Sequence, residues 1–100
     1  MKIYIAGKIT GSDDYCIDFL QAEVDVKGKH KNSVILNPAT TIARIGGLEH
    51  SEYLHICFAM IDIAEAVAFL PNWTESKGAT LEMDYAIRKG KEVIRIMEEL

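Results

Sequence analysis

Residues 66–96 read AVAFLPNWTESKGATLEMDYAIRKGKEVIRI, and this segment contains the pattern that predicts the fold. Short apolar runs at both of its ends are typical of buried strands, and apolar residues between them recur at helical spacing. The predicted elements are a strand at 66–70, a loop at 71–75, a helix at 76–89 stopped by Gly90, and a strand at 92–96. A strand, a helix and a strand in this order predict two parallel strands joined by a right-handed crossover.

The same alternation extends upstream. A strand is predicted at 2–6, ended by Gly7, and it is followed by a helix capped by Ser12 and closed by Gly28. A second strand is predicted at 33–36, where Asn37-Pro38 stops it. A surface connection at 39–49 then leads to a mostly buried helix opened by Ser51 or a neighbour. We therefore expect an α/β, doubly wound (Rossmann/flavodoxin-like) three-layer sandwich with a four-stranded, mainly parallel sheet. All 100 residues are expected to form a single domain.

Composition narrows the function classes. The sequence is 49% hydrophobic and 26% charged, with a formal net charge of −4, and its only basic cluster is Lys27-Gly28-Lys29-His30-Lys31. A mildly acidic protein with so few clustered basic residues lacks the positive surface that binds a nucleic-acid polymer, so a small molecule is the expected partner. The sequence has neither a long apolar run nor a signal-peptide pattern at Met1-Lys2-Ile3-Tyr4, so we expect a cytoplasmic protein without a membrane partner.

The cysteines and histidines give no metal pattern. Cys16 and Cys57 lie far apart without CxxC spacing, and we interpret both as reduced, buried thiols. His50 and His55 are five residues apart, which does not align them on one helical face. We expect no metal and no cofactor.

A ligand site is expected at the carboxyl ends of the strands, where doubly wound sheets bind ligands. The candidate substrate-binding residues follow the first three strands: Gly7, Lys8, Thr10, Gly11, Asn37, Asn72, Trp73, Ser76 and Gly78. Glycines in the first loop permit tight backbone geometry, and the free amides at the start of the 76–89 helix favour an anion. Each has a plainer interpretation: Ser76 as a helix cap, Trp73 as a cover for the sheet edge. The first loop matches neither GxxxxGK[ST] nor GxGxxG.

Glu82 lies on the face of its predicted helix that is expected to be buried. At 100° per residue, the solvated face is centred on Asp84, and Glu82 lies nearly opposite, between Ala79 and Ala86. A buried carboxylate requires a hydrogen-bonding partner, a shifted pKa or a functional crevice. The alternative is a structural acid stabilised by the helix dipole.

An ordered set of motifs carries a family resemblance: Tyr4-Ile5-Ala6-Gly7, Asn37-Pro38, Leu70-Pro71-Asn72-Trp73 and Ser76-Lys77-Gly78-Ala79-x-x-Glu82-x-x-x-Ala86. The chain resembles the nucleoside 2-deoxyribosyltransferase-like superfamily, and more narrowly a branch of small bacterial and phage proteins. The resemblance implies N-glycosidic bond hydrolysis or deoxyribosyl transfer on a nucleotide or nucleoside. It implies that Glu82 attacks C1′ of a deoxyribose or stabilises its cationic form, and that Tyr4 orients this glutamate.

The resemblance also carries departures from the family pattern. A serine at Ser76 is similar to the deoxynucleotide N-hydrolase branch and implies a phosphate contact, whereas Lys8 and Thr10 differ from that branch. The family's aspartate that protonates the leaving base falls at about Cys57 or Phe58, neither of which suits that role. Asp62 and His55 are the nearest substitutes. The alternative to an enzyme is therefore a non-catalytic nucleotide-binding module that retains the fold and crevice.

The sequence also predicts that the protein assembles with copies of itself. The helix opened near Ser51 is unusually apolar around Tyr53, Ile56, Phe58 and Met60, which predicts a homo-oligomer. The family resemblance implies the same, with sites that include residues from a neighbouring copy.

Overall fold

The computed structural model describes residues 1–97 and contains a four-stranded sheet in which neighbouring strands are all parallel. The strands are β1 (Lys2–Ala6), β2 (Val34–Leu36), β3 (Ala66–Phe69) and β4 (Glu92–Arg95), in the order β2-β1-β3-β4. Tyr4 pairs with Leu36 on one side and Val67 on the other, which fixes the register at the sheet centre. Central β1 and β3 are almost completely buried, as expected for strands covered on both faces.

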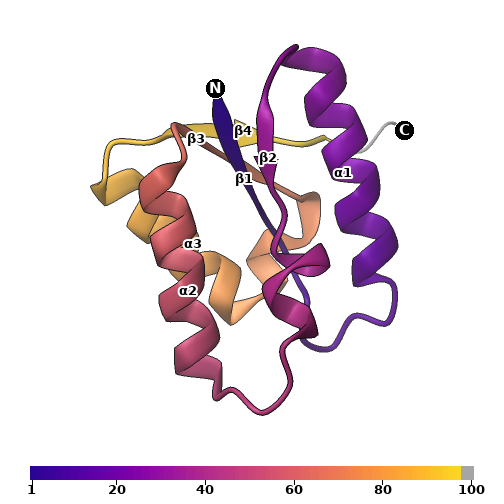
Figure 1. Ribbon diagram of the computed structural model, residues 1–100, viewed down its shortest axis with the longest axis vertical. Helices are drawn as coiled ribbons and strands as arrows, with labels where there is room; N and C mark the ends of the chain where they lie inside the picture. The colour runs from indigo at the N-terminus through magenta and orange to yellow at the C-terminus, as the bar shows by residue number, and fades with distance from the viewer. Residues whose placement is uncertain (98–100) are drawn as a thin grey trace.

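Helices cover both faces of the sheet (Figure 1). The helix α1 (Tyr15–Lys29) lies on one face, while α2 (His50–Ile63) and α3 (Lys77–Arg88) lie on the other. Alternate strand residues divide between two cores: Tyr4 and Phe69 pack with α2 and α3, whereas Ile5 packs with Phe19 of α1. This arrangement confirms the expected three-layer α/β sandwich.

The strand order creates a switch point beside β1. The connection through α1 leads from β1 to β2 on one side, and the connection through α2 returns across β1 to β3 on the opposite face. The chain segments that follow β1 and β3 therefore diverge at the carboxyl edge of the sheet. Doubly wound folds bind their ligands in the crevice formed at this point.

The first helix differs from its predicted bounds. Ser12 is not its cap, because α1 begins at Tyr15 after Asp14, and the helix runs through Gly28 to Lys29. The reversal that Gly28 was expected to provide occurs at Asn32, which adopts a positive φ of 63°. Asparagine tolerates this left-handed conformation better than most residues, so no glycine is needed there.

The second helix is less buried than predicted. It begins at His50, one residue before Ser51, and the Glu49 amide donates to Glu52 Oε1 at 2.8 Å. Only Cys57 and Ile61 of α2 are buried, because one helix on the surface of a small sheet buries a single stripe. Cys16 is also exposed, contrary to the expected buried thiol, since it lies on the outer side of α1.

Residues 1–97 also contain three short 3₁₀ segments: Pro38–Thr40, which begins just before the predicted surface connection, Ile42–Arg44 within that connection, and Pro71–Glu75 after β3. Gly90 has a φ of 70°, which confirms its predicted role in ending α3. Among residues 1–97, no helix combines the length and apolar character needed to cross a membrane.

Candidate active site

A pocket of about 160 Å³ opens at the carboxyl end of β1, between the first turns of α2 and α3. Its walls are mainly apolar, formed by side chains such as Ile9, Phe19, Ile42 and Leu54. Its polar lining comes from Tyr4, Thr10, His50, Tyr53, Cys57, Ser76 and Glu82. An apolar pocket with a few convergent polar groups at a switch point is the usual form of a small-molecule site.

Glu82 lies deep in this pocket, with only 5% of its surface exposed. The small side chains of Ala79 and Ala86 on the same face of α3 are also buried, which lets the helix pack close to the sheet. Asp84 lies on the exposed side and pairs with Arg88, whose Nε donates to Asp84 Oδ2 at 3.0 Å. The helical spacing thus correctly predicted which of these two acids is buried.

The Tyr4 hydroxyl donates a hydrogen bond to Glu82 Oε2. Tyr4 projects from the centre of β1 and is itself 1% exposed, so strand packing fixes the position of its ring. The hydrogen bond therefore holds the carboxyl group from the sheet side.

Burial raises the pKa of Glu82 to about 7, although hydrogen bonds from Tyr4 and Cys57 act in the opposite direction. Burial likewise raises the pKa of the Cys57 thiol to about 12. The pKa of Tyr4 lies well above its usual value, first because of burial and then because of the nearby Glu82 charge. Near neutral pH, Glu82 is thus the group of this cluster that exchanges a proton.

The start of α3 forms one side of the pocket. Ser76 caps the helix, its Oγ accepting a hydrogen bond from the Ala79 amide at 3.0 Å, and Ser76 and Gly78 both line the pocket. A Cβ on Gly78 would lie 3.7 Å from Leu54 Cδ2 and 3.8 Å from His50 Cε1. The capping interpretation of Ser76 is thus confirmed, and its position leaves it available to a ligand as well.

The first loop contributes Gly7 and Thr10 to the lining, while Lys8 and Gly11 lie outside it. A Cβ on Gly7 would lie 2.8 Å from Leu70 Cδ1 and 3.0 Å from Leu70 Cβ, so a larger residue there requires Leu70 to shift. The Lys8 amide donates to Asn72 Oδ1 at 3.2 Å, and Lys8 Nζ lies 3.6 Å from Glu75 Oε1. These contacts join the loops after β1 and β3.

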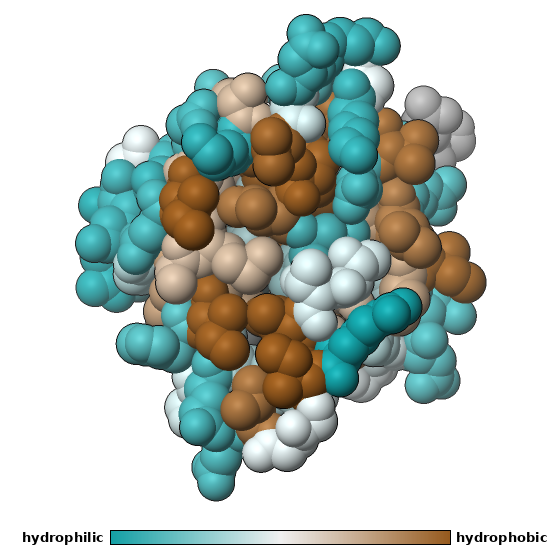
Figure 2. Space-filling model, in the orientation of Figure 1, coloured by the Kyte–Doolittle hydropathy of each residue, from teal (hydrophilic) through white to brown (hydrophobic). Residues whose placement is uncertain are grey.

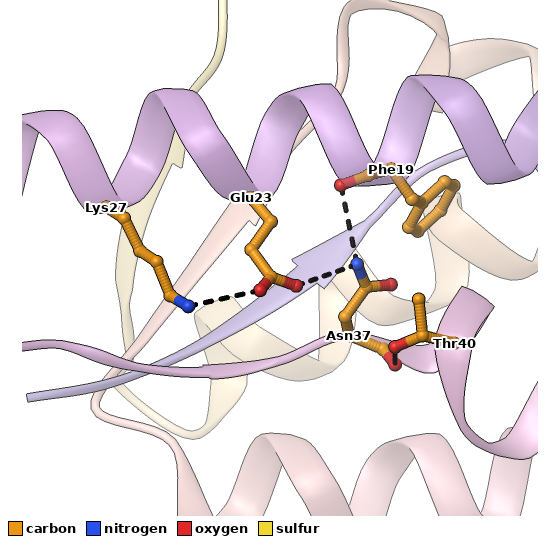
Figure 3. Close-up of polar contacts among 5 residues, drawn as sticks. All are labelled: Phe19, Glu23, Lys27, Asn37 and Thr40. Carbon is orange, nitrogen blue, oxygen red and sulfur yellow. Dashed lines mark hydrogen bonds and ion pairs between the residues drawn. The ribbon is translucent and has the colours of Figure 1, made fainter.

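Asn37 is buried but does not line the pocket. Its Nδ2 donates to Glu23 Oε1 at 3.0 Å and to the Phe19 carbonyl at 3.4 Å (Figure 3). Its Oδ1 accepts from the Ala39 amide at 3.0 Å. The main-chain oxygen of Asn37 accepts from Thr40 Oγ1 at 3.2 Å. Its side chain thus joins α1 to the turn after β2.

Asn72 and Trp73 also lie outside the pocket lining. Trp73 packs edge-on against Phe69, with ring centroids 5.7 Å apart, and the Arg95 guanidinium lies 6.0 Å from the centroid of its ring. Trp73 therefore covers the sheet edge near β3 and β4, the second of the two interpretations open from the sequence.

Three polar pocket residues, His50, Tyr53 and Cys57, were not among the predicted site residues. The signal was present in α2, where His50, Tyr53, Leu54 and Cys57 recur at helical spacing and share one face. Because the helix is strongly apolar, its sequence indicated core packing, and this face was not predicted to line a pocket.

Phe58, one of the two positions matched to the family's aspartate, and the two substitutes, Asp62 and His55, lie outside the pocket. Phe58 stacks on Tyr85 at 4.3 Å, the exposed Asp62 accepts from the Tyr85 hydroxyl at 2.7 Å, and His55 is exposed. None of Phe58, Asp62 and His55 lines the pocket, whereas Cys57 does. Within residues 1–97, no three His, Cys, Asp or Glu side chains gather closely enough to hold a metal ion.

The fold is similar to that of a known protein structure. A solved structure titled "2-desoxiribosyltransferase from Leishmania mexicana" superimposes with a TM-score of 0.69 at 21% sequence identity. The match covers 95% of this chain but 63% of the other, so the chain spans less than two thirds of that protein's length. This likeness confirms the nucleoside 2-deoxyribosyltransferase-like fold.

No curated protein matches the sequence. A family model described as "Domain of unknown function (DUF4406)" matches residues 1–95, so the chain belongs to that family.

Proposed function

We propose that this protein cleaves an N-glycosidic bond of a nucleotide or nucleoside, by hydrolysis or by transfer of the deoxyribosyl group. One observation carries the proposal: the buried Glu82 carboxyl is held by Tyr4 deep in a pocket at the switch point of the sheet. Burying an acid is costly, and such an arrangement is typical of catalytic carboxyl groups. The name of the structural neighbour supports the choice of a glycosyl reaction.

In this proposal Glu82 is the nucleophile. Its ionised Oε1 attacks C1′ of the sugar while the bond from C1′ to the base breaks, and the negative carboxylate stabilises the cationic character of the sugar. Tyr4 binds the other oxygen, Oε2, and so keeps the attacking oxygen pointed into the pocket. Water or a second base then takes the sugar from Glu82.

The proposed substrate contacts divide into two groups. Gly7, Thr10, Ser76 and Gly78 line the pocket and are proposed to contact the substrate directly. Lys8, Gly11, Asn72 and Trp73 are proposed to act indirectly, by shaping the loops that hold the first group. Asn37 is proposed to shape the turn after β2, where Pro38 lines the pocket. The free amides and the Ser76 hydroxyl at the start of α3 favour a substrate with a phosphate.

Base release is the experiment that tests the proposal. Deoxynucleoside monophosphates, deoxynucleosides and ribonucleotides are incubated with the protein, and the free base is measured by chromatography. We expect release by the wild type and none by Glu82→Ala. Asp84→Ala, which removes an exposed acid from the same helix, is the matched control and should keep the activity. Full turnover by Glu82→Ala would remove this residue from the mechanism.

A non-catalytic nucleotide-binding module is the second candidate. The observation in its favour is Cys57, which lies beside Glu82 in the pocket and offers a thiol with a pKa of about 12 in place of a carboxyl group. A binding module should bind a nucleotide by calorimetry in both the wild type and Glu82→Gln, and neither should release base.

We also propose that the protein forms a homo-oligomer through α2. Ile56 and Met60 are half-buried and Ile63 is 58% exposed, so α2 presents apolar surface outside the core. Figure 2 shows brown and tan side chains gathered over the region of α2. Sedimentation at micromolar concentration should give a mass above that of one chain, and Ile63→Lys should lower it; a monomer would contradict this proposal.

A further inference from the structure

We propose that the preferred substrate is an N-glycoside whose base already carries a positive charge, such as a pyridinium or an N7-alkylated purine. The inference rests on the proposed glycosidase function and names its leaving group. It follows from which groups line the pocket and where they lie.

Glu82 is the one acid among the described residues that line the pocket, and its ionised form is negative. Among residues 1–97, the side chains that line the pocket include the carboxyl group of Glu82 but no lysine, arginine or second acid. A buried carboxylate without a cationic partner attracts a cation strongly, because the apolar walls screen the interaction poorly. A cationic ring bound there would also favour the ionised, nucleophilic form of Glu82.

The groups beside Glu82 are poor proton donors. Cys57 contributes a thiol with a pKa of about 12, and Tyr4 has a pKa raised well above its usual value. A neutral base leaves as an anion unless an acid protonates it, and such an acid contributes about 10² to 10⁴ in rate. The immediate surroundings of Glu82 provide no such acid.

Two titratable groups remain in the lining, Tyr53 and His50. The Tyr53 hydroxyl donates to the Ile45 main-chain oxygen, and the exposed His50 is the first residue of α2. It precedes Cys57 by seven residues of α2, which is roughly 10 Å along the helix axis. Its Cε1 would lie 3.8 Å from a Cβ on Gly78, in the first turn of α3 and one turn before Glu82. This position suits a contact with a distal part of the substrate.

A cationic base needs no proton to leave. Glu82 Oε1 donates an electron pair to C1′, and the C1′–N bond breaks. Its electron pair goes to the ring nitrogen, which cancels the positive charge and releases a neutral base. Water then attacks C1′, the sugar gains a hydroxyl group, the Glu82 carboxylate is restored, and the water's second proton passes to solvent. The step uses only the substrate and water.

The test compares matched substrates that differ in the charge of the base. The pairs are N7-methylguanosine against guanosine and N7-methyl-2′-deoxyguanosine against 2′-deoxyguanosine, each with and without a 5′-phosphate. Nicotinamide riboside and its 5′-phosphate form the pyridinium arm. Rates are corrected for the background measured with Glu82→Gln, and the two arms show which cationic ring is preferred.

We expect kcat/KM to be at least about 100-fold higher for the charged member of a pair. A preference below about tenfold, with release that depends on Glu82, would overturn this inference and leave the proposed function standing. Absence of release from every substrate would overturn both.

A variant provides a second measurement. Cys57→Asp places a carboxyl acid beside Glu82, and we expect the ratio of neutral to cationic kcat/KM to rise about tenfold or more. Cys57→Ser is the matched control of similar size without an acid, and it should not raise the ratio. A folded Cys57→Asp protein whose ratio equals that of Cys57→Ser would contradict the claim that an acid is what the pocket lacks.

Discussion

Tyr4 and Glu82 are 78 positions apart in the sequence and are joined by a hydrogen bond from the tyrosine hydroxyl to Glu82 Oε2. The bond connects the central strand to the helix that crosses behind the sheet, and both side chains are almost completely buried. It links the sheet and the candidate nucleophile in one contact. Changes to either partner should therefore alter both stability and reactivity.

The stability of the protein should fall as pH rises through neutrality, because of Glu82. Its pKa is about 7 in the folded protein against a reference value of 4.5, so the folded state binds this proton more tightly than the unfolded state. Stability from this group is complete below the reference pKa and declines as pH rises through the folded pKa. The decline amounts to about 3 kcal/mol.

Urea unfolding at several pH values measures this decline. Glu82→Gln should remove most of the loss between about pH 5 and about pH 8, while Asp84→Asn should keep it. Equal pH dependence in the wild type and Glu82→Gln would show that Glu82 ionises as easily as an exposed acid.

Tyr4→Phe should raise the pKa of Glu82 further, because the tyrosine hydroxyl favours the ionised carboxylate. Hydrogen bonds to charged groups contribute about 1.5 to 3 kcal/mol, so base release near neutral pH should fall by roughly 10- to 100-fold. The loss should shrink at higher pH, and the pH profile of kcat/KM is the measurement. A uniform loss at every pH would indicate a role for Tyr4 other than control of this proton.

Gly7→Ala should destabilise the protein by about 1 to 3 kcal/mol. The added methyl group would lie 2.8 Å from Leu70 Cδ1 and 3.0 Å from Leu70 Cβ, and it would push apart the loops after β1 and β3. Gly46→Ala is the matched control, since nothing lies within 4 Å of an added Cβ there. Thermal unfolding compares the two, and equal melting temperatures would contradict the close approach at Gly7.

Ser76 has two separable roles that substitutions can distinguish. Ser76→Ala removes the cap on the Ala79 amide and should cost about 1 kcal/mol, whereas Ser76→Asp keeps a capping oxygen. The aspartate also adds a negative charge to the pocket, which should weaken binding of a nucleoside monophosphate more than binding of the nucleoside. Calorimetry with both ligands measures the difference, and equal weakening would place the phosphate away from Ser76.

The fold and the position of Glu82 were predictable because both follow from periodicity. Strand and helix patterns alternate along the chain, and the 100° spacing placed Glu82 on the buried face with Asp84 outside. Ser76 and Gly90 were predictable for a related reason, since caps and stops depend on local backbone chemistry.

The rest of the site depends on contacts between distant segments, which a local pattern does not contain. Asn37 follows a strand at the expected edge of the sheet. Its side-chain amide, however, forms hydrogen bonds with Glu23, Phe19 and Ala39 rather than facing the pocket. His50 belongs to the site because α2 packs against α3, which helix periodicity alone does not show. The exposure of Cys16 likewise depends on how α1 lies on the sheet.

The most direct test of the central claim is to trap the sugar on Glu82. The protein is mixed with the best substrate from the base-release panel, quenched with acid during turnover, digested, and analysed by mass spectrometry. We predict a glycosyl ester on the peptide that contains Glu82, absent from the Glu82→Gln protein, which should also release no base. Base release by the wild type with the adduct on another residue, or undiminished release by Glu82→Gln, would contradict the assignment of Glu82 as the nucleophile.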